Sequence, residues 1–323
     1  MIPEESKLKI IKYAAQAPSE HNTQPWKFKI TGDTITISPD FTRSLAVADR
    51  DSHAMYISLG CALENMIIAA NEFNYEAKAD IGKDENGLSV RVLLYEGGKI
   101  EKSGLFDYIV KRQVTRSKYH PGRIPNKILS ELFGDTDDDG IHSRLFLSET
   151  EIKSLIPYVI KGHRLQSGNR HYVKELVSWS RFSEKEAMLK GDGLWSASFG
   201  LPSFGRFIGP ACMKMPVYSR RESRRLTEMM LTSSGLVMFL AEKNDPYHWI
   251  RLGQAFQQFG LRATKLQVSH SHLNMPCGEL QVRNELIRDF NMQDLTPLLL
   301  IRFGYSDPMP YSFRRKFYNL LDQ

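Results

Sequence analysis

The sequence predicts an α+β fold, and three observations lead to this prediction. Helical and strand patterns are mixed along the chain without the regular strand–helix–strand alternation that is typical of a parallel, doubly wound sheet. Hydrophobic residues make up 41% of the chain, which is enough to build a core and excludes intrinsic disorder. At roughly 100–200 residues per domain, the 323 residues correspond to two units, separate or fused around one core.

The first hundred residues predict two helices and two pairs of strands. Apolar residues recur at helical spacing over 5–16, where Pro18 ends the segment, and they alternate on both sides of a Gly-Asp turn over 26–38. Residues 53–73 are apolar over most of the surface of the predicted helix, so we expect this helix to be buried at the centre of the molecule. Further strands are predicted at 75–80 and 88–95.

A polar, glycine-containing stretch at 96–103 is predicted to be a linker, and a second series of elements starts at residue 104. Helices are predicted from the position of Pro125, which suits a first helical turn, and from periodicity further along the chain. The predicted elements are a short helix after 104, helices from 125, at 149–163, 169–188 and 248–268, and strands at 235–242 and 297–304.

Residues 191–215 form an unusual segment with five glycines and two prolines among aromatic residues. A loop of this length inside a compact protein is usually functional or disordered. We expect an ordered loop that covers a ligand, with Trp195, Phe199, Phe204 and Phe207 on its underside. The alternative is a surface loop whose aromatic side chains pack on neighbouring helices.

Charge, cysteines and motifs exclude several classes of function. The net charge of +6 fits an anionic small ligand as well as nucleic acid, but no basic face with interleaved aromatics indicates nucleic-acid binding. Three separated cysteines predict neither disulfides nor a thiolate metal site. His270 and His272 could ligate a metal ion, but no nearby carboxylate or cysteine completes the set. We find no phosphate-binding glycine loop, dinucleotide fingerprint or nucleophile elbow. No signal peptide or membrane span is indicated, so a cytoplasmic protein is expected.

The turn between the first helix and the hairpin, Ala17-Pro18-Ser19-Glu20-His21-Asn22-Thr23-Gln24-Pro25-Trp26, concentrates hydroxyl, amide and imidazole groups. These groups donate and accept hydrogen bonds in both directions, which suits a polar heterocycle with amide-like edges. A capping turn with Trp26 in the hairpin core explains the same composition.

The second informative segment is Lys111-Arg112-Gln113-Val114-Thr115-Arg116. Arg112 and Arg116 lie four residues apart with a hydroxyl between them, so they can converge on one phosphate through charge-assisted hydrogen bonds. Two unrelated surface arginines are the alternative.

Together these segments resemble the nitroreductase family of FMN proteins. The APS-x-HNTQPW block is similar to the family's flavin-contacting turn, and R-x-x-T-R is similar to its phosphate motif, with Thr115 in place of the usual serine. Phe303-Gly304-Tyr305 and the pair Arg314-Arg315 resemble its closing strand and C-terminal basic pair. Gly60-Cys61-Ala62 and Leu252-Gly253-Gln254 both resemble its long central helix.

The order of the motifs resembles the Acg-type branch of that family, in which two family folds are fused into one chain as an intramolecular pseudo-dimer. The resemblance implies a first half at 1–100 with the flavin-contacting turn, and a second half at 105–323 with the phosphate-binding arginines. It also implies one composite FMN site. The implied cofactor-binding residues are Ser19, His21, Asn22, Gln24, Arg112, Thr115, Arg116, Asn274, Met275, Arg314 and Arg315.

The resemblance implies an oxidoreductase that passes hydride from NAD(P)H through FMN to a nitro or quinone-type small-molecule acceptor. No side-chain acid or base is required for the hydride step, so no catalytic residue and no metal are predicted. A protein that stores FMN under a covering loop, with little turnover, is the alternative. The fused chain is expected to be a monomer in which the two halves form the pseudo-dimer. Further oligomerisation is left open.

Overall fold

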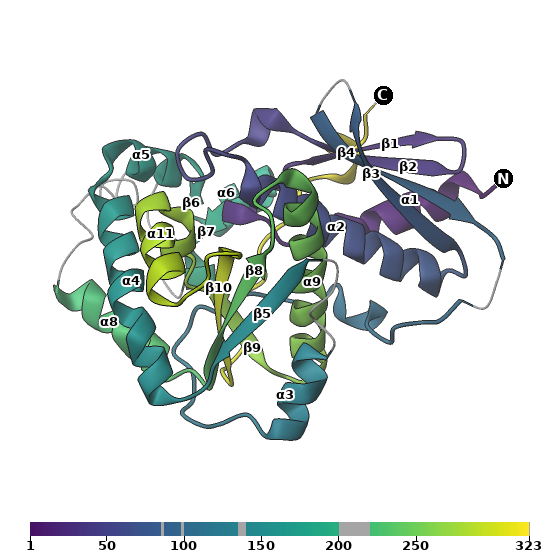
Figure 1. Ribbon diagram of the computed structural model, residues 1–323. Helices are drawn as coiled ribbons and strands as arrows, with labels where there is room; N and C mark the ends of the chain where they lie inside the picture. The colour runs from purple at the N-terminus through teal and green to yellow at the C-terminus, as the bar shows by residue number, and fades with distance from the viewer. Residues whose placement is uncertain (85–86, 98–99, 135–139, 200–219, 323) are drawn as a thin grey trace.

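The computed structural model describes residues 1–84, 87–97, 100–134, 140–199 and 220–322. Two four-stranded antiparallel sheets lie beside a pair of long helices, α2 (His53–Glu72) and α9 (Pro246–Lys265), which run through the middle of the molecule (Figure 1). This arrangement confirms the predicted α+β class.

The first sheet belongs to the N-terminal part of the chain and has the strand order β1-β2-β4-β3. Its strands are β1 (Trp26–Thr31), β2 (Thr34–Pro39), β3 (Glu76–Asp84) and β4 (Gly87–Tyr95). Ile30 faces Ile35 across the Gly-Asp turn, so the predicted hairpin is confirmed. Buried residues of α1 (Glu4–Ala14) and α2 pack in one core with this sheet.

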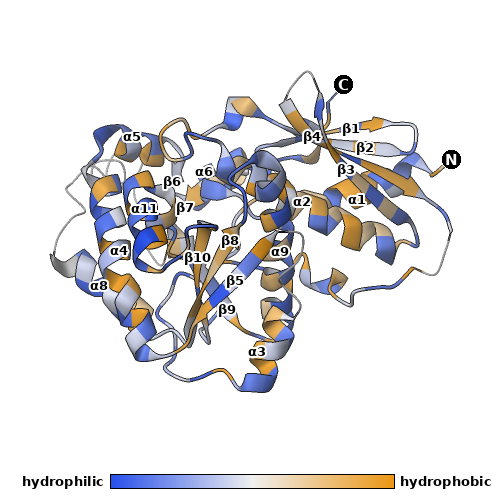
Figure 2. Cartoon of the chain, viewed as in Figure 1, coloured by the Kyte–Doolittle hydropathy of each residue, from blue (hydrophilic) through white to orange (hydrophobic). Residues whose placement is uncertain are grey.

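The second sheet has the order β5-β8-β10-β9 and carries helices on both faces. Its strands are β5 (Ile141–Phe146), β8 (Gly235–Ala241), β9 (Ser269–His272) and β10 (Thr296–Gly304). Helix α9 packs on one face, and α4 (Glu149–Gly168), α8 (Arg220–Leu231) and α11 (Leu280–Asp289) cover the other. Hydrophobic and hydrophilic residues alternate along α4 and α8, as expected for helices with one buried face (Figure 2).

One predicted helix, 169–188, is wrong as a continuous element. The structure divides it into α5 (Arg170–Ser178), the short strand β6 (Ser180–Arg181) and α6 (Glu184–Lys190). Ser183 begins α6 by accepting a hydrogen bond from the backbone of Glu186, and β6 pairs in parallel with β7 (Leu194–Trp195). Capping and strand pairing therefore override the apolar periodicity on which the prediction rested. The helix predicted from Pro125 is α3 (Asn126–Phe133), and α10 (Met275–Gly278) follows β9.

Helices α2 and α9 approach each other most closely at Gly60 and Gly253. A Cβ atom on Gly60 would lie 2.0 Å from the carbonyl oxygen of Ile250, and one on Gly253 would lie 2.1 Å from that of Ile57. Beside this crossing the Cys61 thiol donates to the Gly253 carbonyl oxygen at 3.2 Å. Glycine at both positions thus lets the two central helices pack backbone to backbone.

We expect Gly253→Ala to lower the free energy of unfolding by about 1–3 kcal/mol, because the added methyl group forces the helices apart. Urea unfolding of the variant measures the loss. Gly168→Ala, in α4, is the matched control, since nothing lies within 4 Å of a Cβ atom there. Equal stability of the two variants would show that α2 and α9 can separate without cost.

Within the described ranges, α2 is the one helix long and apolar enough to cross a membrane, but 89% of its most apolar stretch is buried inside the protein. Its first turn is held by Asp49, whose carboxylate accepts the backbone N–H groups of Ala54 and Met55 at 2.9 Å each. The helix is therefore the buried central element that the sequence predicts.

The C-terminal tail leaves the second sheet and returns to the first. Phe28 of β1 donates its N–H to the Leu320 carbonyl, and Asp322 donates to the Phe28 carbonyl, both at 2.8 Å. The yellow C-terminal trace accordingly reaches the first sheet in Figure 1. This crossover carries Arg314 to the turn that precedes β1.

Candidate functional site

Two adjoining cavities lie where the N-terminal turn, the segment after Ile109 and the C-terminal tail meet. The main cavity has a volume of about 280 Å³ and the arginine cavity, named for its lining, about 200 Å³. They share the lining residues Pro18, Ser19, Val114, Arg116 and Leu194. Because their walls are shared, we treat them as one site of the size that small-molecule ligands occupy.

The turn at residues 19–24 forms one wall of this site. Ser19 lines both cavities, and its hydroxyl oxygen accepts the backbone N–H of Gln24 at 2.8 Å. His21, Asn22 and Gln24 have positive φ angles of 48°, 54° and 52°. Left-handed backbone is costly in non-glycine residues and occurs mainly where the surrounding structure or a function requires it.

Asn22 and Gln24 connect the turn by hydrogen bonds to residues 191–193 and 313–315. The Asn22 amide donates to the carbonyls of Gly193 and Phe313, and its oxygen accepts the Arg314 guanidinium at 3.0 Å. Gln24 lines neither cavity. It is fully buried, its amide donates to the Gly191 carbonyl at 2.8 Å, and its oxygen accepts the Arg315 N–H at 2.9 Å. Gln24 therefore connects the turn to Gly191 and Arg315, and its predicted contact with a ligand stays a prediction.

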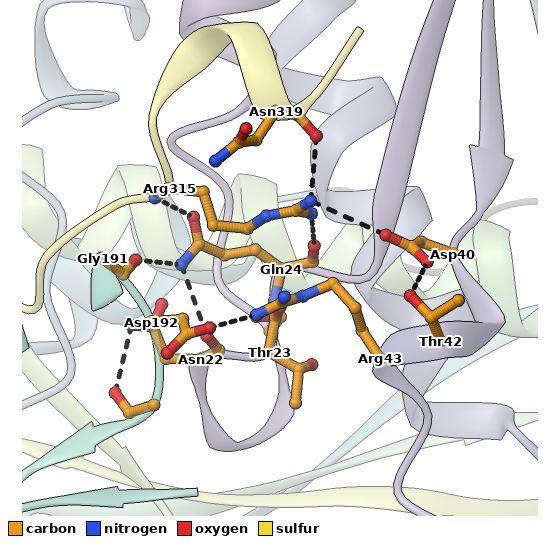
Figure 3. Close-up of polar contacts among 12 residues, drawn as sticks. Asn22, Thr23, Gln24, Asp40, Thr42, Arg43, Gly191, Asp192, Arg315 and Asn319 are labelled. Carbon is orange, nitrogen blue, oxygen red and sulfur yellow. Dashed lines mark hydrogen bonds and ion pairs between the residues drawn. The ribbon is translucent and has the colours of Figure 1, made fainter. Parts of the chain in front are cut away.

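Arg315 also faces away from both cavities, unlike the prediction. Its guanidinium donates to the carbonyl oxygens of Gln24 and Asn319 and lies 3.7 Å from the Asp40 carboxylate (Figure 3). Consecutive residues of an extended chain point to opposite sides. Arg314 therefore lines the arginine cavity, while Arg315 contacts Gln24, Asn319 and Asp40.

The arginine cavity contains a concentration of positive charge. Arg112, Arg116 and Arg314 line it, and its described lining contains no aspartate or glutamate. Arg112 is only 6% exposed, and its Nε and Nη1 atoms are buried without a hydrogen-bond partner among the residues that the structure describes. Burial lowers the pKa of Arg112 to about 10, and burial together with the neighbouring Arg112 charge lowers that of Arg314 to about 9. Buried charges are normally paired, so an anion in this cavity would supply the counter-charge that these guanidinium groups lack there.

Arg116 lies between the two cavities, and its guanidinium carbon is 4.3 Å from the centre of the Phe199 ring. Burial lowers its pKa to about 10. Thr115 is buried between these arginines and lines neither cavity, and its predicted contact with a phosphate stays a prediction. Its N–H donates to the His270 carbonyl and its carbonyl accepts the Tyr119 hydroxyl.

The second sheet supplies the opposite wall of the main cavity. His272 ends β9, and the predicted residues Asn274 and Met275 follow it into the cavity lining. The Asn274 side-chain oxygen accepts the Leu300 N–H at 2.9 Å, which fixes this loop on β10. Burial lowers the pKa of His272 to about 4, so its ring is neutral at neutral pH.

The part of segment 191–215 that the structure describes ends at Phe199. Leu194 lines both cavities and Phe199 lines the main one, whereas the Trp195 ring packs on Phe313. Phe204 and Phe207 lie outside the described residues. The segment therefore contributes to the wall of the site. Trp195, which was predicted to face the ligand, is not among the lining residues.

Sequence reasoning missed His53 and Tyr172, which also line the main cavity. His53 Nδ1 lies 2.5 Å from Asp51 and 3.2 Å from Asp49, a group that could in principle ligate a metal. Asp49, however, already caps α2, and the imidazole already contacts both carboxylates. These contacts explain the cluster without an ion. No spacing signal in the sequence connects these residues to the cavity.

The chain is similar over nearly its whole length to two curated proteins of Mycobacterium tuberculosis, from strains CDC 1551 and H37Rv, that are named as candidate NAD(P)H nitroreductases. Each is 20% identical over a range that covers 95% of this chain and 88% of the relative. No family model matches the chain. The predicted resemblance to nitroreductases is thus confirmed for the chain as a whole, while the fusion of two halves stays a prediction.

Among solved structures, a nitroreductase with bound FMN from Bacteroides fragilis is 14% identical and aligns with a TM-score of 0.40. An FMN-dependent nitroreductase of Mycobacterium smegmatis, solved in complex with NADPH, is 13% identical with a TM-score of 0.41. These alignments cover 67% and 64% of this chain and 96% and 92% of the respective neighbours.

Proposed function

We propose that the chain is an FMN-binding oxidoreductase that uses NAD(P)H to reduce nitro or quinone-type acceptors. In this proposal residues 1–100 and 105–323 are two nitroreductase-like halves fused into an intramolecular pseudo-dimer. The observation that carries the proposal is the arginine cavity, with buried, unpartnered Arg112 beside Arg314 and no carboxylate in its lining. The names of the two curated relatives support the choice of NAD(P)H as electron donor.

The residues around the two cavities fit FMN. Arg112, Arg116 and Arg314 would neutralise its terminal phosphate, which carries roughly −1.5 to −2 charges at neutral pH. Ser19 would donate its hydroxyl proton to the ligand, since its oxygen already accepts the Gln24 N–H. Asn274 and Met275 would contact the ring system in the main cavity. Bound FMN would supply hydride transfer, and the chain would orient it.

The fused halves are supported by the arrangement of the central elements. Helices α2 and α9 cross at paired glycines, and each packs on a four-stranded sheet of its own. The site combines Ser19 and His21 from the first half with Arg112, His272 and Arg314 from the second. The sequence has one such N-terminal turn, and the described residues form one such arginine cavity, so we expect one ligand per chain.

We expect the purified protein to be yellow, to release FMN rather than FAD on denaturation, and to bind one FMN per chain. The physical reason is that a cluster of arginines without acids suits a terminal phosphomonoester. Chromatography of the heat-released cofactor and titration of the apoprotein test both statements. Recovery of FAD, saturation at two flavins, or a colourless protein that FMN does not reconstitute would overturn them.

Storage of FMN without useful turnover is the second candidate, and the wall formed by Leu194 and Phe199 favours it. Both residues belong to the segment after Gly191 and line the main cavity, and Phe199 packs on Arg116. A covered site would admit bulky acceptors poorly. Steady-state NAD(P)H consumption with nitroarenes and quinones separates the candidates: turnover supports the reductase, and tight FMN binding without turnover supports storage.

A further inference from the structure

His21 has an atom whose bonding the rest of the fold does not explain. Its side chain lines the main cavity and is buried, yet Nδ1 has no hydrogen-bond partner among the described residues. Asn22 and Gln24 share its left-handed backbone, but both of their amides are hydrogen-bonded. A buried polar atom without a partner costs about 1–3 kcal/mol. The left-handed turn therefore places a residue in the wall of the cavity whose buried ring nitrogen lacks a hydrogen-bond partner among the described residues.

The other nitrogen of this ring faces a carboxylate that reaches solvent. His21 Nε2 lies 3.5 Å from Glu20 Oε1, and the Glu20 side chain is 38% exposed. Glu20 also lines the main cavity. The distance is long for a hydrogen bond, but such contacts are often long in sites without ligand and shorten in the complex. The imidazole thus connects a solvent-facing acid to the buried cavity.

We propose that Glu20 and His21 form a proton relay that carries a proton from solvent to the electron acceptor in the main cavity. The proposal rests on the proposed function. Reduction of a quinone by NAD(P)H consumes one hydride and one proton and yields NAD(P)⁺ and the hydroquinone. The hydride supplies both electrons. His21 gives its Nδ1 proton to an acceptor oxygen while Nε2 takes up a proton from a hydronium ion held beside the Glu20 carboxylate, which leaves water.

The charges around His21 suit a group that passes a proton on. Burial lowers the pKa of His21, and the positive charge of Arg116 acts in the same direction. Glu20 and Glu175 of α5 raise the pKa again, but burial is the largest cause. The ring is therefore neutral at neutral pH and has one N–H and one free nitrogen, as a relay requires. His272 on the opposite wall is neutral too, but the contact of Nε2 with the Glu20 carboxylate at 3.5 Å distinguishes His21.

Reoxidation of the NAD(P)H-reduced protein by two acceptors tests the relay. Benzoquinone takes up protons with its electrons, whereas ferricyanide takes up electrons alone. For His21→Gln and Glu20→Gln we expect the ratio of the benzoquinone rate to the ferricyanide rate to fall about 100-fold, the scale of lost general-acid catalysis. Glu175→Gln is the matched control, because Glu175 also faces His21 but binds the backbone N–H groups of Val47 and Ala48. Its ratio should stay within about twofold of wild type.

Nitrogen NMR of histidine-labelled protein, without FMN or acceptor, gives a readout independent of activity. We expect His21 to titrate below its usual value, and to titrate lower still in Glu20→Gln because Glu20 raises its pKa. A His21 pKa that is the same in wild type and in Glu20→Gln would overturn the relay. An unchanged ratio of the two reoxidation rates, in variants that NAD(P)H reduces normally, would overturn it as well. Failure to bind FMN or to be reduced by NAD(P)H would instead contradict the proposed function, and the NMR result would still decide whether Glu20 and His21 are coupled.

Discussion

Replacing Arg112 with alanine is expected to raise the dissociation constant for FMN by about 10- to 150-fold, corresponding to the 1.5–3 kcal/mol of a hydrogen bond to a charged group. The same change should leave the stability of the apoprotein unaltered or raise it. The pKa of Arg112 is lowered to about 10 from 12.5, so the folded chain holds this proton less tightly than the unfolded chain does. Below pH 10 the buried charge therefore opposes folding until an anion binds, and its removal relieves that cost.

Fluorescence titration with FMN and thermal unfolding of the apoprotein measure the two effects separately. Lys118→Ala is the matched control: it also removes one positive charge near the arginine motif, but Lys118 is exposed and lines neither cavity. If FMN affinity falls equally in both variants, Arg112 acts only through the net charge of the protein and does not contact the phosphate. An Arg112→Ala apoprotein that unfolds much more easily than wild type would make Arg112 a structural residue.

The elements that sequence reasoning predicted well are those whose periodicity reflects burial. The helix at 53–73 matches α2 within one residue, and the apolar runs at 235–242 and 297–304 match β8 and β10. Strand β9 was not predicted, because its sequence is Ser-His-Ser-His and has no apolar alternation. It pairs with β10 at the edge of the sheet, and His272 at its end faces the cavity. A polar wall of a site does not show the period that identifies a strand.

The motifs indicate which segments of the chain meet at the candidate site, but they do not indicate which side chains of those segments line the cavities. The turn and the arginine motif meet at the two cavities. The predicted residues in the cavity linings are Ser19, His21, Asn22, Arg112, Arg116, Asn274, Met275 and Arg314. Gln24, Thr115 and Arg315 face elsewhere. Spacing cannot distinguish Arg314 from Arg315, because the difference depends on the path by which the tail returns to β1. That path is set by backbone pairing with Phe28, which leaves no pattern in the side chains.

Asp192→Ala is expected to lower the free energy of unfolding by about 3–5 kcal/mol, the cost of breaking a buried ion pair from one side. Asp192 receives two hydrogen bonds from Arg181, at 2.6 and 3.2 Å. It receives a further one from Arg43, which Figure 3 shows. The side chains of Asp192, Arg181 and Arg43 are only 10%, 6% and 17% exposed. Without the carboxylate, two largely buried guanidinium groups would share one space with no counter-charge.

Urea unfolding measures this loss, and Asp80→Ala on β3 provides the matched comparison. Asp80 also pairs with one arginine, Arg91 at 2.6 Å, but their side chains are 66% and 59% exposed, so its loss should cost at most about 1 kcal/mol. Asp192 lies between Gly191, which binds Gln24, and Gly193, which binds Asn22. Hydrogen exchange at 191–199 should therefore accelerate in Asp192→Ala and stay unchanged in Asp80→Ala. If both variants lose the same small amount of stability, water already screens the Asp192 network, and the wall formed by Leu194 and Phe199 must be held by backbone contacts alone.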